Sequence, residues 1–95
     1  MRNYETIFIL RPSIEEEQRI AAIDKFKAII NADGEVEKVE EWGNKRLAYE
    51  IEKIREGYYV YVTFKANSTL PAELERNYKI SDDVIRYIIV NLEEK

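Results

Sequence analysis

The sequence contains no cysteine and no histidine, and its 95 residues include only three glycines and two prolines. Without cysteine the chain forms no disulfide and offers no thiolate for a metal or for nucleophilic catalysis. Without histidine it lacks the commonest general base and the commonest metal ligand. No apolar run approaches the roughly 20 residues of a membrane-spanning helix. We therefore expect neither an enzyme nor a membrane protein, with no cofactor, no metal and no small-molecule substrate.

The first residues are mixed and polar, which is unlike a signal peptide, and we expect a soluble cytoplasmic protein. A chain of this length buries roughly 60–65% of its unfolded surface, which is enough for a core without disulfides. The apolar fraction of 45% is ordinary for a globular protein. Residues 1–95 are thus expected to form one domain.

The formal net charge is −4, from 15 basic and 19 acidic side chains. An acidic chain binds nucleic acid poorly in a non-specific way, because such binding depends on an overall positive field. A local basic patch remains compatible with this charge. Any RNA contact is then expected to be small, or to be shared with a more basic partner.

Alternation with a period of two predicts four strands, over residues 3–10, 36–52, 58–66 and 84–92. The first carries apolar residues on both faces, which is typical of a central strand. The second is interrupted at Gly43, as by a bulge or bend. Residues 53–57, which contain a glycine, are expected to form the hairpin loop that follows.

Two helices are expected between these strands. Ser13 and Glu16 have the spacing of a capping box, and an apolar stripe follows along the first helix. That helix should end near Ala32, with Asp33 and Gly34 in a left-handed turn. Residues 67–69 can cap the second helix. The apolar stripes consist of Ile20, Ile23, Phe26 and Ile30 in the first helix and of Leu70, Leu74 and Tyr78 in the second.

The element order is therefore β-α-β-β-α-β. Right-handed crossovers place both helices on one face of a four-stranded antiparallel sheet, with the first and third strands in the middle. This is an α+β fold of the ferredoxin-like type. Acylphosphatase-like enzymes share this topology but need a phosphate-cradling loop after the first strand, and here that loop, Arg11-Pro12-Ser13, has no glycine.

The segment 41–51 combines strand alternation with two adjacent cations. Apolar and polar residues alternate from Leu47 onward, and Lys45 and Arg46 lie beside the bend at Gly43. One interpretation is a bent edge strand whose charges are solvated. The other is a basic corner that contacts phosphate.

Residues 42–51, with the sequence WGNKRLAYEI, resemble the signature of the bacterial small-subunit ribosomal protein six family. Glu50 stands where many members carry proline. The resemblance extends over essentially the whole chain, because further motifs agree in order and spacing: Arg2-x-Tyr4-Glu5, Arg11-Pro12, Gly57-Tyr58-Tyr59 and Ile85-Arg86-Tyr87.

This resemblance implies the same ferredoxin-like fold and a structural, non-enzymatic role in the small ribosomal subunit. It also implies pairing with small-subunit ribosomal protein eighteen, and that the two proteins join the central domain of the small-subunit ribosomal RNA as a unit. A basic partner of this kind would explain how an acidic chain associates with RNA.

The sheet face away from the helices is expected to be apolar, although a solvated face is usually polar. We interpret it as a surface for a protein partner. The alternatives are that β-propensity alone selects these residues, or that the strand phase is off by one residue. The expected partner-binding residues are Ile7, Ile9, Tyr59, Tyr61, Ile88 and Val90.

Open sheets of this fold can also bind single-stranded RNA by stacking bases on aromatic residues of the third strand. Tyr59 and Tyr61 have the required spacing, but the basic and glycine-rich start of the usual motif is missing. Trp42 is expected to pack over the bend, and Tyr49 to lie on the apolar side of its strand.

Phosphate contacts are expected to come from a scattered set of cations, which would recognise backbone and shape more than base sequence. A second possibility is a regulatory module that binds a protein or a metabolite and never meets RNA. Net acidity favours that possibility, and the WGNKRLAYEI motif opposes it. The candidate RNA-binding residues are Arg2, Lys45, Arg46, Lys53, Arg55 and Arg86.

Overall fold

Strands and helices alternate in the predicted order in the computed structural model, which describes residues 1–51 and 53–93. The sheet order is β2-β3-β1-β4, with antiparallel pairing throughout, so β1 and β3 are central as predicted. The elements are β1 (Arg2–Leu10), α1 (Glu16–Asp33), β2 (Gly34–Ile51), β3 (Ile54–Ala66), α2 (Leu70–Ile80) and β4 (Val84–Asn91).

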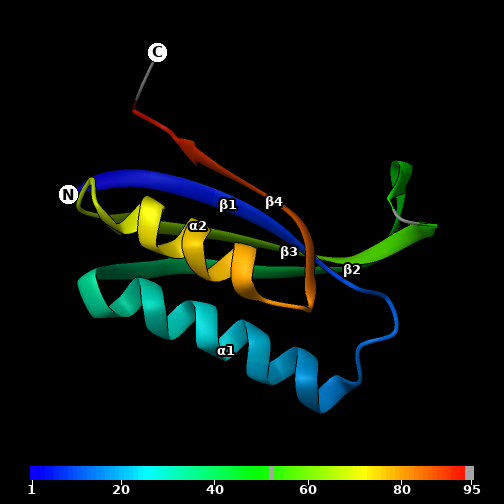
Figure 1. Ribbon diagram of the computed structural model, residues 1–95. Helices are drawn as coiled ribbons and strands as arrows, with labels where there is room; N and C mark the ends of the chain where they lie inside the picture. Colours follow the sequence, from blue (N-terminus) through cyan, green and yellow to red (C-terminus); the bar gives the residue numbers. More distant parts are fainter. Residues whose placement is uncertain (52, 94–95) are drawn as a thin grey trace.

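Both helices cover the same face of the sheet, and the opposite face is left without a helix (Figure 1). The ferredoxin-like prediction is thereby confirmed. The core lies between the sheet and the helices, and it contains the alternate residues of β1 and β3 that face the helices, including Phe8 and Val60. The rings of Phe8, Phe26 and Tyr78 lie 4.7–5.3 Å apart and link β1 to both helices.

Thr6 is a fully buried polar residue in this core, and its hydroxyl group joins three elements. Thr6 Oγ1 donates to the carbonyl oxygen of Ile88 in β4 at 2.8 Å. Thr6 Oγ1 also lies 3.1 Å from the hydroxyl group of Tyr78 in α2. Because the single threonine proton goes to Ile88, the Tyr78 hydroxyl is the donor in the second bond. Burial raises the pKa of Tyr78 above the usual tyrosine value.

The helix α1 ends at Asp33, close to the predicted Ala32, but its capping differs from the sequence prediction at both ends. The helix begins at Glu16 after the N-cap residue Glu15, and Ser13 does not cap it. The Ser13 hydroxyl instead accepts a hydrogen bond from Arg11 at 3.1 Å. At the other end Gly34 is extended, with φ −165°, and does not form a left-handed turn. Glycine is required there because a Cβ atom would lie 2.3 Å from the carbonyl oxygen of Lys65.

The apolar stripe of α1 also differs in one position, because Ile20 is 49% exposed. The buried positions of α1 are Ala22, Ile23, Phe26 and Ile30. One turn earlier on the same side, the guanidinium group of Arg19 lies 4.5 Å from the centre of the Tyr58 ring. A cation on an aromatic ring thus takes the place that an apolar residue was expected to fill.

The hairpin between β2 and β3 is tighter than predicted. The sequence places a loop at 53–57, but β3 already begins at Ile54, which pairs with Ile51. Lys53 has a positive φ of 69° and supplies the turn that a glycine was expected to supply. The predicted end of β2, Glu52, lies outside the described residues. The predicted bulge at Gly43 is confirmed by its φ of 83° and a register shift.

The hydrogen bonds of Thr6 predict that Thr6→Val and Tyr78→Phe destabilise the protein to different extents. Thr6→Val removes the acceptor of the buried Tyr78 hydroxyl and should lower the free energy of unfolding by about 1–3 kcal/mol. Tyr78→Phe leaves Thr6 bonded to Ile88 and should cost less, about 0.5–1.5 kcal/mol. Urea unfolding of both variants and of the double variant measures this difference. An equal or larger loss for Tyr78→Phe would contradict the donor assignment.

Candidate binding surface

The six residues predicted to meet a protein partner come together on the sheet face that the helices leave open. Ile7 in β1 pairs with Tyr61 in β3 on one side and with Ile88 in β4 on the other, and together they form a row across three strands. In the next row Ile9 pairs with Tyr59. Val90, opposite Glu5, continues the surface along β4.

Exposure varies strongly along this face. Ile88 is 47% exposed and Val90 38%, whereas Ile9 is only 6% exposed. Ile9 lies in a small cavity of about 160 Å³, together with Ile7, Tyr59 and Ile88. The accessible apolar surface is therefore centred on β4, and Ile9 forms part of its floor.

The distal hairpin of β2 and β3 covers the other end of this face. It turns to the side away from the helices, as Figure 1 shows. Tyr49 of β2 contacts Arg86 of β4, although these strands are at opposite edges of the sheet. The Arg86 guanidinium lies 5.0 Å from the centre of the Tyr49 ring and donates a hydrogen bond to the Tyr49 hydroxyl. We call residues 44–51 and 53–57 the arm.

Leu47 and Tyr49, both on the arm, differ sharply in exposure. Leu47 is 8% exposed and Tyr49 is 58% exposed. Tyr49 was predicted to lie on the apolar side of its strand, and this side is therefore buried only in part. The contact between Tyr49 and Arg86 could not be predicted from the sequence pattern, because it joins residues 37 positions apart. The available signals were the unusual length of the predicted strand over residues 36–52 and the glycine at its bend.

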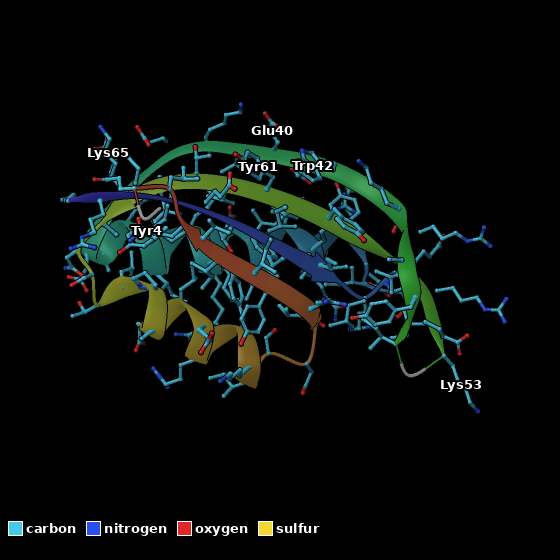
Figure 2. The ribbon with its side chains drawn as sticks, turned by 90° about the horizontal axis from the view of Figure 1, so that it is seen from above. Tyr4, Glu40, Trp42, Lys53, Tyr61 and Lys65 are labelled. Atoms are coloured by element: carbon cyan, nitrogen blue, oxygen red, sulfur yellow. The ribbon has the colours of Figure 1, made fainter. Side chains whose placement is uncertain are left out.

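Trp42 packs at the bend, as predicted, and it packs on Tyr61. Their rings are stacked with centroids 5.2 Å apart and an interplanar angle of 16° (Figure 2). Lys45 Nζ lies 4.9 Å from the centre of the Trp42 ring, and Trp42 Nε1 donates to Glu40 at 2.9 Å. Part of the Tyr61 ring is thus occupied within the chain, which reduces its capacity to stack on a nucleotide base.

Tyr61 is also fixed at its hydroxyl group. The hydroxyl donates to a carboxylate oxygen of Glu5 at 2.8 Å, and this hydrogen bond raises the pKa of Tyr61 above its ordinary value. The Tyr61 side chain is therefore held on the open face by Trp42 at its ring and by Glu5 at its hydroxyl group.

Five of the six candidate RNA-binding cations gather at one end of the molecule. Lys45, Arg46, Lys53 and Arg55 belong to the arm, and Arg86 contacts it through Tyr49. The Arg55 guanidinium forms an exposed ion pair with Glu50 at 3.6 Å. Such a pair is worth little in water and is readily exchanged for a phosphate.

Arg2 lies apart from these five cations. It pairs with Ala66 at one end of β1, whereas Arg86 pairs with Ile9 near the other end. The separation along β1 is about 23 Å at 3.3 Å per residue. Arg2 and Arg86 lie on neighbouring strands, β1 and β4, but this separation keeps them out of a common site.

Other kinds of site find no support in the part of the chain that the structure describes. Residues 1–51 and 53–93 hold no group of three acidic side chains placed to bind a metal ion. Within the same residues, no helix is both long and apolar enough to cross a bilayer. The surface that stands out is an open sheet face with a cationic arm.

The protein is an open antiparallel sheet backed by two helices, and the free face of the sheet is apolar. No catalytic group is visible among the described residues. These features define a ferredoxin-like binding protein. Residues 3–91 match the family described as ribosomal protein S6. The chain belongs to this family. It is a structural protein of the small ribosomal subunit and not an enzyme, and the predicted location on the cytoplasmic ribosome is confirmed by this membership.

Individual relatives agree over nearly the full length. The small ribosomal subunit protein bS6 of Alkaliphilus oremlandii is 55% identical over 94 residues, covering 99% of this chain and 100% of the relative. That of Clostridium novyi is 56% identical over 95 residues with the same coverage. The crystal structure of 30S ribosomal protein S6 from Thermotoga maritima superposes with a TM-score of 0.90 at 35% identity, covering 95% of this chain and 86% of that one.

Proposed function

We propose that this chain binds the central domain of the small-subunit ribosomal RNA together with small-subunit ribosomal protein eighteen. The observation that carries the proposal is the juxtaposition of two surfaces. The exposed Ile88 and Val90 provide an apolar contact area on β4. The arm beside it carries Lys45, Arg46 and Arg55.

Each surface suits a different partner. Aliphatic side chains on a fixed sheet gain free energy by burial against a protein, roughly 25 cal/mol for each Å² removed from water. They offer no hydrogen bonds to RNA bases. Arginine and lysine on a projecting hairpin instead suit phosphate, for which the guanidinium group provides two parallel donors.

The overall charge supports joint binding. With a net charge of −4 the chain gains little from non-specific attraction to RNA. A local group of cations becomes sufficient when a basic protein on the neighbouring surface neutralises further phosphates. The RNA and the protein partner would then each strengthen binding of the other.

Binding to a central-domain RNA fragment should therefore be tight only in the presence of ribosomal protein eighteen. Filter binding or fluorescence anisotropy at fixed salt, with and without the partner, measures this cooperativity. Equal and tight binding by the chain alone would move the RNA contact onto its own surface and reject the joint mode. Absence of binding by a folded sample in both cases would favour a regulatory module that does not use RNA.

Ile88→Asp should weaken binding to ribosomal protein eighteen by about tenfold or more, because an unpaired carboxylate would enter an apolar contact. Ile80→Asp is the matched control, since Ile80 is 63% exposed and lies at the end of α2. Calorimetric titration of both variants compares them. Unchanged affinity of a folded Ile88→Asp variant would exclude the open face as the partner surface.

Arg46→Gln should reduce the slope of log affinity against log salt by about 0.7–0.9 for the complex of both proteins with RNA. Arg46 is exposed on the arm. The control is Arg76→Gln, because Arg76 is exposed on α2 and ion-paired with Glu73 at 2.6 Å. Parallel salt titrations separate the two, and identical slopes would remove Arg46 from the phosphate contacts.

A further inference from the structure

Within residues 1–51 and 53–93, no further strand pairs with the outer edge of β4. β4 is the last strand of the sheet and pairs with β1. The Leu92 N–H donates to Asn3 at 2.9 Å, and the Ile88 carbonyl oxygen also lies on the β1 side, where Thr6 reaches it. Since backbone groups alternate along a strand, the N–H and C=O groups of Tyr87, Ile89 and Asn91 point outward.

This edge lacks the features that normally prevent pairing with another strand. The sequence of β4, VIRYIIVN, contains no proline, lysine or glycine, and its register is regular from Arg86 to Asn91. The one charged side chain, Arg86, is held by Tyr49. The opposite edge, β2, has three register shifts and many charged residues. Charges and bulges protect an edge, so β2 is protected and β4 is not.

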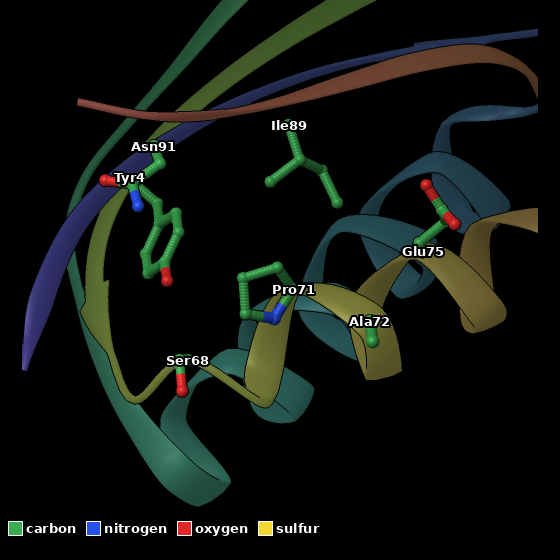
Figure 3. A pocket seen from close by; sticks show the side chains of 7 residues that line it. All are labelled: Tyr4, Ser68, Pro71, Ala72, Glu75, Ile89 and Asn91. Atoms are coloured by element: carbon green, nitrogen blue, oxygen red, sulfur yellow. The ribbon is translucent and has the colours of Figure 1, made fainter. Parts of the chain in front are cut away.

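A groove runs beside this edge, between β4 and α2. It contains a cavity of about 340 Å³ whose lining includes Ile89 and Asn91, two of the residues with outward backbone groups. Figure 3 shows the Tyr4 ring and the Ile89 side chain on the sheet side, facing Pro71 and Ala72 of α2. An added strand would place every second side chain in this cavity.

The residues that line the cavity indicate which side chains an added strand should carry. Glu75 is the only charged residue of the seven described residues that line the cavity, and Ser68 and Tyr4 contribute hydroxyl groups. The carboxylate of Glu75 is paired with Lys79 at 3.3 Å in a solvent-exposed ion pair, which another cation can replace at little cost. On the other face, an added strand would lie next to Ile88 and Val90, both exposed and aliphatic.

We propose that the groove between β4 and α2 binds an extended, basic peptide segment of a partner protein as a fifth strand. Lysine or arginine side chains of the segment reach Glu75, and the alternate aliphatic side chains continue the apolar surface of Ile88 and Val90. The net charge of −4 attracts a basic segment at long range. The backbone contact uses the sheet edge and requires no RNA.

The test is an NMR titration of the ¹⁵N-labelled chain with the acetylated peptide Lys-Val-Lys-Val-Lys-Val-Lys. We expect shifts and slower amide exchange at Tyr87, Ile89 and Asn91. Glu75→Gln should weaken the affinity about two- to fivefold, as expected for an exposed ion pair. The matched control, Glu17→Gln, removes the same charge from exposed α1 and should leave the affinity unchanged.

Three outcomes would overturn the proposal. Amide protection absent from the β4 edge would exclude strand addition. Equal binding of the peptide Glu-Val-Glu-Val-Glu-Val-Glu would exclude recognition by charge. Shifts at β4 that depend on the concentration of the chain alone would assign the edge to a second copy, and would reject a foreign basic segment as its occupant.

Discussion

The fold depends on β1 being apolar on both faces and paired on both edges. Its helix-facing residues, such as Phe8, fill the core, and its opposite residues, such as Ile7, need cover of another kind. Two helices cover one face of a four-stranded sheet, so the second face must be solvated, covered by the chain itself or covered by a partner. At one end Gly57 of the arm lies against Ile9, whereas Ile88 and Val90 remain exposed, and it is there that the proposed protein partner would provide the cover.

The charge distribution follows the same division. The arm carries four cations, Lys45, Arg46, Lys53 and Arg55, against two carboxylates, Glu50 and Glu56. A chain can therefore be acidic overall and still present a local positive field, since screening limits each field to about 8–10 Å at physiological salt. The net charge alone favoured a regulatory module that does not bind RNA, whereas the grouping of the cations on the arm favours contact with phosphate.

The sequence predicted the topology well because alternation and helical spacing report burial directly. The helix-facing residues of β1 and β3 were predicted correctly. The bulge at Gly43 was also predicted, because this glycine, which has a positive φ, interrupts the alternation of apolar and polar residues. The predicted caps of α1 were wrong where another local interaction competed. Ser13 bonds to Arg11 and not to a helix N–H, and Gly34 serves close approach to Lys65 and not a left-handed turn.

The bend of the arm could not be predicted from periodicity, because it depends on contacts distant in sequence. Alternation specifies which side of a strand is apolar, but not how far a long hairpin curves after a bulge. The contact of Tyr49 with Arg86 fixes that curvature and brings a residue of the apolar face next to the cations. A protein seated on Ile88 would thus lie beside Arg86 and the arm, and the proposed protein and phosphate contacts would share one boundary. Such a boundary would give a physical reason for the two proposed partners to bind together, because a basic protein seated there would bring its charges next to the same phosphates.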